Sequence, residues 1–390
     1  MNTSWVRVET GSGVGVVPSF GTRLGRREEY WRLVAEIGGG ADNAELGLAP
    51  EAHSTPSVRY SRMPIRSTAF TFGVCRQGLG AATLIWLLAV LVTAGPAGAG
   101  YRVGIGEHSA AMFSTPAWHS LGLKRVRYVV AWDWARTGAL AEVDAFMSSA
   151  RAQGQDVLVT FGAHSGCFDG VRYSRRKVCR APSASAYRAA VRRFDDRYPW
   201  VRTYSAWNEV NHISQPTFTR PRLAVRYYRV LRSESRRRHF RVLAADVLDT
   251  ANVHRYLRSF LRHAPGRPRL WGLHNYQDVN NGTSLDTQTM LETVPGEVWM
   301  TETNGIVAFE GSGQWPYSES RAARRTRWMF RLAERYDTRR RGMRSRITGV
   351  FVYNWFGAPP GARFDSGLVD PDGSPRAAYF VVRAYARSNR

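Results

Sequence analysis

The fold is decided by residues 203–211, which read TYSAWNEVN, together with residues 297–304, which read EVWMTETN. In each stretch a short run of apolar and β-prone residues ends on a carboxylate, Glu209 in the first and Glu302 in the second. This pattern indicates a buried strand that delivers one acid to the end of a sheet. A single glutamate after a strand is commonly just an exposed residue. Two of them in matching contexts predict a pair of acids that work together.

The composition predicts a large folded domain. The chain has 390 residues, is 44% hydrophobic and contains 13 Trp, so it can bury a sizeable core, and a barrel of roughly 250 residues forms one domain. The formal charge is +24, but Lys124 and Lys177 are the only lysines among 55 basic residues. The excess arginine is spread along the chain and does not form one patch. We therefore expect no nucleic-acid partner, although the positive field favours acidic over cationic polymers.

The first hundred residues resemble a leader. Residues 1–62 are Gly-rich and weakly periodic, which predicts a disordered or misassigned leader, with a functional tail as the alternative. Residues 63–99 combine a basic start, an apolar stretch over 81–93 and the small-residue run Pro96-Ala97-Gly98-Ala99, which is typical of a secretory signal peptide. If it is not cleaved, the segment serves as a membrane anchor. We expect a secreted protein, or a membrane-anchored one with its folded domain outside.

Cysteine usage agrees with export. Without the leader only Cys167 and Cys179 remain, twelve residues apart in a polar, Arg-rich loop. An even pair in a secreted chain predicts a disulfide, which would stabilise the fold by roughly 2–3 kcal/mol. Two cysteines without a clustered pair of histidines supply too few ligands for a metal site.

From residue 101 onward, strand-like and helix-like segments alternate. Eight short β-prone runs are separated by helical patterns or long connections, which predicts a closed parallel (β/α)8 TIM barrel with helices outside. The expected strands are 101–106, 125–131, 156–161, 203–207, 241–245, 270–273, 298–301 and 349–353, and the expected helices include 140–153, 185–197, 220–238, 253–264, 318–336 and 375–388. An open doubly wound sheet is the competing fold. It is disfavoured because Gly104-Ile105-Gly106-Glu107 lacks the third glycine of a phosphate-binding turn.

Polar and aromatic residues collect at the ends of the expected strands. In a parallel barrel the carboxyl ends of the strands form the face that carries chemistry. The residues that follow strands two to eight are Trp132-Asp133-Trp134, His164, Asn208-Glu209, Asp246, His274-Asn275-Tyr276, Glu302 and Asn354-Trp355.

These motifs resemble the clan A glycoside hydrolases, and the resemblance covers about residues 101–390. In that group an Asn-Glu follows barrel strand four and a second Glu follows strand seven, as Asn208-Glu209 and Thr301-Glu302 do here. The overall look is closest to the glucanase, xylosidase and mannanase-like branches. The resemblance implies a retaining glycosidase domain over residues 100–390 that cleaves O-glycosidic bonds of a poly- or oligosaccharide. It implies no metal or organic cofactor, and we expect a monomer.

The resemblance also assigns roles. Glu209 is the expected acid/base, its pKa raised by burial and by the charge of Glu302, and Glu302 is the expected nucleophile. Asn208 would bind the sugar 2-hydroxyl, although ordinary loop capping also explains it. The other expected substrate-binding residues, each of which also has an ordinary structural explanation, are Arg127, His164, His274, Tyr276 and Trp355. Trp355 would be the sugar platform, and Trp132, Trp134 and Trp315 would extend the cleft.

Two alternatives stay open at this point. A carbohydrate-binding barrel without turnover would keep the aromatic residues but would not need both Glu209 and Glu302. Unrelated barrel chemistry or polyanion binding would give affinity that collapses with added salt. The sugar, the linkage and the choice between internal and terminal cleavage are not readable from the sequence.

Overall fold

The computed structural model describes residues 5–10, 13–18 and 100–388, apart from residues 137, 165, 166, 169–172, 175, 177, 178, 310–314, 360 and 361. It divides into two compact units, Met1–Ala97 and Gly98–Arg390. In the first unit, strands β1 (Trp5–Thr10) and β2 (Gly13–Pro18) pair antiparallel, with Trp5 opposite Pro18. The sequence predicts no element there. The predicted signal or anchor over 63–99 lies outside the described residues, so the division of the chain stays a prediction. None of the described helices is long and apolar enough to cross a membrane.

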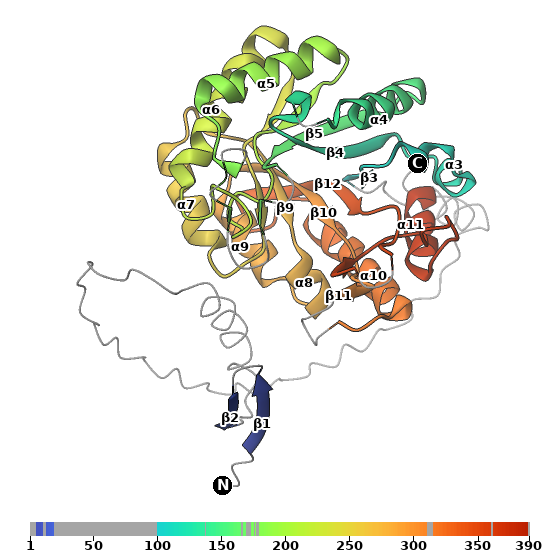
Figure 1. Ribbon diagram of the computed structural model, residues 1–390. Helices are drawn as coiled ribbons and strands as arrows, with labels where there is room; N and C mark the ends of the chain where they lie inside the picture. Colours follow the sequence, from blue (N-terminus) through green and yellow to red (C-terminus); the bar gives the residue numbers. More distant parts are fainter. Residues whose placement is uncertain are drawn as a thin grey trace, which may run out of the picture. The chain divides into compact units, whose positions relative to one another are not determined.

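The second unit is a parallel barrel, as the sequence predicts (Figure 1). Its strands are β3 (Arg102–Gly106), β4 (Arg125–Ala131), β5 (Asp156–Gly162), β6 (Thr203–Ser205), β7 (Arg241–Leu243), β8 (Asp246–Leu248), β9 (Leu270–His274), β10 (Gly296–Thr303) and β12 (Ser345–Tyr353). They are hydrogen-bonded in the order β7-β6-β5-β4-β3-β12-β10-β9-β8. The two end strands, β7 and β8, are consecutive parts of one segment.

The fifth barrel strand therefore consists of two short pieces, whereas the sequence predicts one strand over 241–245. β7 pairs with β6 on one side, and β8 pairs with β9 on the other. Between them the amide of Ala244 donates to Leu270 O, and the amide of Gly272 donates to Ala245 O, both at 2.9 Å. These bonds close the barrel. Asp246, predicted to follow strand five, is instead the first residue of β8.

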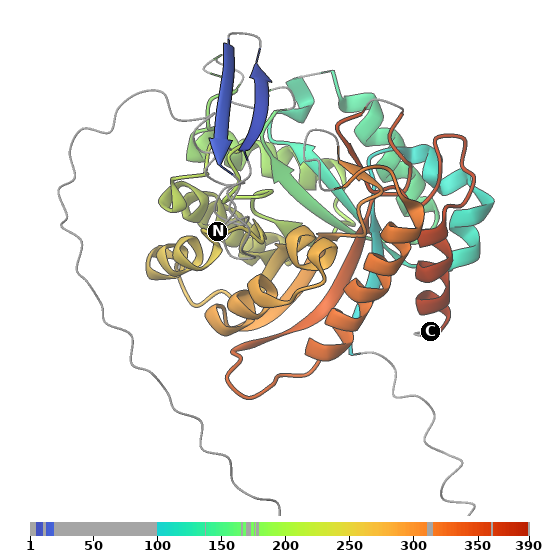
Figure 2. The ribbon, with the colours of Figure 1, turned by 90° about the horizontal axis from the view of Figure 1, so that it is seen from below.

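Helices surround the strands (Figures 1 and 2). They are α3 (Pro116–Leu121), α4 (Leu140–Ala152), α5 (Ala184–Arg197), α6 (Pro221–Arg238), α7 (Val253–His263), α8 (Tyr276–Asn281), α9 (Leu285–Thr293), α10 (Glu319–Tyr336) and α11 (Ala377–Ser388), with short 3-10 turns over Ala110–Ser114 and Trp134–Arg136. The helices over α4 to α7, α10 and α11 match the predicted ranges within two residues. The short helices α3, α8 and α9 are additional to the predicted set.

The periodicity of the sequence explains how the helices pack. In α5, Tyr187, Val191 and Phe194 recur at helical spacing and are buried, and the Ser183 hydroxyl caps the helix by accepting from the amide of Ala186. The opposite face is rich in arginine. Two of these arginines link α5 to α6, because Arg188 and Arg192 form ion pairs of 3.2 and 2.9 Å with Glu234.

The barrel interior has an apolar layer below a polar one. Five side chains from five strands form a separate buried cluster: Leu158, Leu243, Leu270, Trp299 and Phe351. Arg125 lies against this layer, with its guanidinium carbon 4.5 Å from the centre of the Trp299 ring. Arg127, two residues further along β4, points the same way at the next level, because side chains alternate along a strand. The layer of side chains that contains Arg127 can therefore hold polar groups inside the barrel.

Glu107 links the segment after the first barrel strand, β3, to the segment after the last one, β12. It follows β3, is buried, and one of its carboxylate oxygens accepts from the amides of His108 and Ser109. The other oxygen accepts from the amides of Trp355 and Phe356, just after β12. A carboxylate can satisfy four donors because both of its oxygens only accept.

Replacing Glu107 with Gln should lower the free energy of unfolding by about 2–4 kcal/mol, because the amide nitrogen faces buried N–H donors that it cannot satisfy. Urea denaturation of the parent and variant measures this. Glu142→Gln, at an exposed position on α4, is the matched control and should change stability by less than about 0.5 kcal/mol. Equal stability of both variants would contradict the role of Glu107.

Candidate active site

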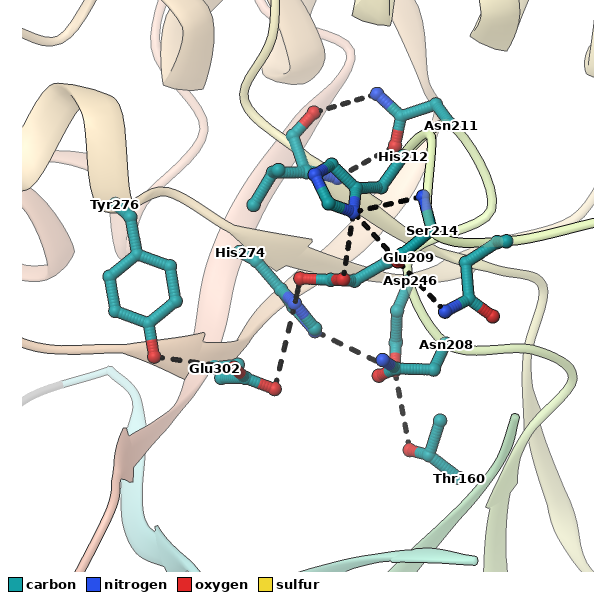
Figure 3. Close-up of polar contacts among 12 residues, drawn as sticks. Thr160, Asn208, Glu209, Asn211, His212, Ser214, Asp246, His274, Tyr276 and Glu302 are labelled. Carbon is teal, nitrogen blue, oxygen red and sulfur yellow. Dashed lines mark hydrogen bonds and ion pairs between the residues drawn. The ribbon is translucent and has the colours of Figure 1, made fainter. Parts of the chain in front are cut away.

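Glu209 and Glu302 lie at one opening of the barrel (Figure 3). Glu209 follows β6 and Glu302 lies near the end of β10, with 18% and 13% of their side chains exposed. A carboxylate oxygen of each and a ring nitrogen of His274 all lie within 4.8 Å of one another. Carboxyl groups roughly 5–5.5 Å apart are characteristic of retaining glycosidases. The two predicted glutamates thus lie together at one site.

The residues around Glu209 are held by buried partners. Trp207 is fully buried, stacks on Tyr227 with ring centres 4.5 Å apart, and donates its indole N–H to Gln215. The amide of Asn208 donates to Phe161 O at 2.8 Å. Glu209 itself has a φ of 44°, a left-handed conformation that is uncommon for a residue with a side chain. Such strain persists where the surroundings enforce it, and here it directs the carboxylate into the opening.

Glu302 sits where the strand pairing is irregular. It lies opposite His274 on β9, and the register of β10 shifts between Met300 and Glu302. A shift of this kind re-aims the side chains that follow it. Tyr276, the first residue of α8, donates its hydroxyl to one oxygen of Glu302 at 3.3 Å. This contact agrees with the expected position of Tyr276.

Arg127 connects the predicted site residues. One terminal nitrogen of its buried guanidinium is 2.9 Å from Glu302. The other donates to Asn208 Oδ1 at 2.7 Å and to Asp246 at 3.1 Å. The bond to Asn208 Oδ1 fixes the orientation of the Asn208 amide group. Asp246, also fully buried, receives a second bond from the Thr160 hydroxyl at 3.2 Å. The sequence placed Asp246 at the barrel mouth but assigned it no role.

His274 lies between the two glutamates. Its Nδ1 atom is 3.2 Å from Glu209 and 3.6 Å from Glu302, while Nε2 is 3.3 Å from Arg127 and 3.9 Å from Asp246. Burial lowers the pKa of His274, but the surrounding carboxylates outweigh burial and raise the pKa to about 9. The raised pKa favours the protonated imidazole.

The pKa of Glu209 differs from the prediction. Burial raises it, but the nearby His274, His212 and Arg127 outweigh burial and lower the pKa to about 2. The predicted rise is therefore wrong for the protein without substrate. The reason is that the cation on His274 stabilises the Glu209 carboxylate.

His212 is a second histidine beside Glu209, and it was not a predicted site residue. Its Nδ1 atom lies 3.6 Å from Glu209 and 2.8 Å from the Ser214 hydroxyl. The ring of Phe168 contacts His212 edge-on at 6.5 Å. Phe168 adjoins Cys167, which forms the predicted disulfide with Cys179. The spacing of three residues from Glu209 was the available sequence signal for His212.

Trp355 cannot be a sugar platform, so that prediction is wrong. It is fully buried, with ring contacts to Trp118 and Tyr379 in the outer layer. The aromatic side chain at the end of the last barrel strand is Tyr353, which is half-buried. Burial raises the pKa of Tyr353, and the charges of Glu302 and Glu107 raise it further. Trp134 is likewise buried, and with Trp132 it lines a small pocket of about 60 Å³ against α5.

His164 lies outside the hydrogen-bonded group around the glutamates. It follows β5 and is partly exposed, and its Nδ1 atom is 3.5 Å from Asp133. Both residues follow barrel strands on the same face as Glu209 and Glu302. His164 therefore remains a candidate for substrate contact at the rim and has no direct role in the group around the two glutamates.

The group of Glu209, His274 and Glu302 has the spacing of metal ligands. Metal binding requires an unprotonated imidazole, whereas His274 carries a proton because its pKa is about 9. Glu302 is already paired with Arg127. A metal ion at this group would have to displace the His274 proton and compete with the Arg127 guanidinium for Glu302.

Structure comparison returns glycoside hydrolases. No protein-family model and no curated protein matches the chain. Similar solved structures include a family 39 glycoside hydrolase from Bacteroides cellulosilyticus WH2 (16% identity, TM-score 0.47, covering 74% of this chain and 64% of that one). An endo-beta-1,4-glucanase from Xanthomonas axonopodis pv. citri has 16% identity and a TM-score of 0.47, and the match covers 74% of this chain and 99% of that one. A beta-glucuronidase from an uncultured Clostridium sp. has 12% identity and a TM-score of 0.49, and the match covers 74% of this chain and 50% of that one. The chain spans less than two thirds of the length of the first and last of these.

Replacing Glu302 with Gln should lower the pKa of His274 from about 9 by at least about one pH unit, because the Glu302 charge is the strongest interaction that raises it. The titration of histidine ring signals by NMR measures this. Glu334→Gln removes an exposed carboxylate on α10 and is the control, for which the His274 titration should not move. An unchanged titration in the Glu302 variant would show that the imidazole is not charged by this site.

Proposed function

We propose that this protein is a secreted retaining glycoside hydrolase that cleaves O-glycosidic bonds of a poly- or oligosaccharide. The observation that carries the proposal is the close approach of Glu209 and Glu302, with one oxygen of each within 4.8 Å at one opening. Secretion is supported by the disulfide between Cys167 and Cys179, since such bonds persist mainly in oxidising compartments.

In the first step Glu302 attacks the anomeric carbon, and the bond from this carbon to the leaving oxygen breaks. Arg127 and Tyr276 bind the Glu302 carboxylate and hold it for attack. Glu209 donates a proton to the leaving oxygen, and the product is a covalent glycosyl ester on Glu302. Asn208, whose carbonyl oxygen is bound by Arg127, turns its amide N–H groups toward a sugar hydroxyl.

Glu209 obtains its proton from His274. The two residues are 3.2 Å apart, and exclusion of water by the sugar weakens the stabilisation of two separated charges. The proton then moves from Nδ1 of His274 to the Glu209 carboxylate. In the second step Glu209 accepts a proton from water, the water oxygen bonds to the anomeric carbon, and the ester to Glu302 breaks. The proton taken from water then passes from Glu209 to Nδ1 of His274, and the site returns to its starting protonation.

Glu302→Gln should reduce turnover of aryl glycosides by on the order of 10³-fold or more, because the amide is a poor nucleophile. Glu209→Ala should lose about 10²–10⁴-fold on substrates with poor leaving groups and much less on activated ones. Added azide should restore the Glu209→Ala rate by taking the place of the base-activated water. Rates on a panel of aryl glycosides and polysaccharides measure this, with Glu334→Gln as control. Parent-like activity in both variants would end the enzyme proposal, and sugar binding without turnover would favour a carbohydrate-binding barrel.

The alkaline limb of the kcat/KM profile should lie near pH 9, because below this pH the shared proton is present and above it His274 loses the proton. His274→Asn should move this limb to lower pH, because Glu209 then has no neighbouring imidazole that supplies its proton. The measurement is kcat/KM as a function of pH on an aryl glycoside with a poor leaving group, whose cleavage requires the proton. A limb at the same pH in both proteins would exclude His274 as the proton source.

A further inference from the structure

A second pocket lies on the same face of the barrel as the two glutamates. The strands β11 (Ala308–Phe309) and β13 (Phe364–Asp365) pair antiparallel, with Phe309 opposite Phe364. β11 lies in the connection that follows β10, and β13 in the one that follows β12. Both connections therefore leave the carboxyl ends of barrel strands, the face that carries Glu209 and Glu302. Figure 1 shows β11 beside α8 and α10.

A series of ring contacts joins this small sheet to the catalytic group. Tyr276, which binds Glu302, contacts Phe364 edge-on with ring centres 5.5 Å apart. Phe364 contacts Phe309 at 5.9 Å, and Phe309 stacks on Trp315 at 6.0 Å with ring planes 15° apart. These contacts form an unbroken series of aromatic rings from Tyr276, which binds Glu302, to Trp315 in the pocket.

The pocket, which we call the distal pocket, has a volume of about 450 Å³. Its walls include Trp315, Tyr317, Pro359 and Ala362, and Asp370 and Arg376 are among its polar residues. This size and this combination of apolar walls with a few polar groups are typical of small-ligand sites. Tyr317 is 60% exposed at the rim, which is unusual for a large aromatic side chain.

The polar groups of the distal pocket favour a neutral ligand. Arg376 is buried and already binds Asp365 at 2.8 and 2.9 Å and Asp370 at 2.8 Å. The two carboxylates outnumber the single guanidinium, so an anionic ligand would meet a net negative charge. Asp370 has 39% of its side chain exposed and can accept hydrogen bonds from hydroxyl groups. Aromatic and proline walls suit the apolar C–H face of a pyranose.

We propose that the distal pocket is a sugar-binding subsite that holds a neutral glycosyl unit of the same saccharide chain whose bond is cleaved between Glu209 and Glu302. This inference rests on the proposed glycosidase function and specifies its substrate: a neutral chain long enough to extend from the catalytic group along the Tyr276–Phe364–Phe309 surface. Binding at a distance favours cleavage within a chain over removal of single terminal units.

Two variants test the distal pocket. Tyr317→Ala removes its exposed aromatic wall, and Ala362→Trp fills its volume. The matched control is Phe380→Ala, because Phe380 is an aromatic residue on α11 that is 48% exposed and does not line the pocket. The probes are cello-, xylo- and manno-hexaose together with the aryl glycosides of the same sugars. Thermal unfolding verifies that each variant is folded.

For the sugar series that the parent cleaves, the ratio of kcat/KM on the hexaose to kcat/KM on the aryl glycoside should fall about tenfold in both variants, mainly through KM. It should stay at the parent value in Phe380→Ala. An unchanged ratio, or equal loss on both substrates, overturns the distal pocket. Turnover of none of these substrates by the parent instead overturns the proposed glycosidase function, so the two failures are distinguishable.

Discussion

The site depends on one buried cation, the guanidinium of Arg127. It lies inside the barrel without exposure and contacts Asp246 and Glu302, two acids from different strands. A charge in this position is tolerated only when it is paired and hydrogen-bonded. The same group also binds Asn208 and approaches His274. Arg127, on β4, therefore orients side chains from β8, β9 and β10 and from the segment after β6. Its own direction follows from the alternation of side chains along β4, which places Arg125 against Trp299 one level below.

A second consequence of this arrangement is that charges, not burial alone, decide where the proton resides. Burial by itself would favour a neutral Glu209, as in an isolated carboxyl group in an apolar pocket. In this site the imidazole of His274 is close enough to two carboxylates to become the cation, and it lowers the pKa of Glu209 to about 2. The proposed acid is therefore Glu209, whereas the higher pKa belongs to its neighbour His274. This feature depends on distances of 3.2 and 3.6 Å, which no sequence pattern encodes.

Aromatic residues illustrate how adjacent positions can exchange expected roles. The run Tyr353-Asn354-Trp355 ends the last barrel strand, and the larger Trp355 is the better sugar platform on chemistry alone. In the fold, Trp355 is buried and packs against Trp118 and Tyr379, whereas Tyr353 is half-buried and contacts His108. The amides of Trp355 and Phe356 are bound by Glu107, which keeps this segment in place. The aromatic contacts next to Glu302 run instead from Tyr276 through Phe364 and Phe309 to Trp315.

By itself the sequence determined the eight barrel strands, the six long helices, the disulfide and the two glutamates, because alternating periodicity and strand-end acids are local patterns that follow from backbone geometry. It also led to Arg127, Asn208, His274 and Tyr276 through strand position and motif resemblance. Only the tertiary structure decided the division of the fifth strand, the roles of Asp246 and His212, the inward or outward direction of Trp355, and the protonation of His274 and Glu209. Each of these depends on contacts between residues far apart in the chain, whose distances are set when the barrel closes.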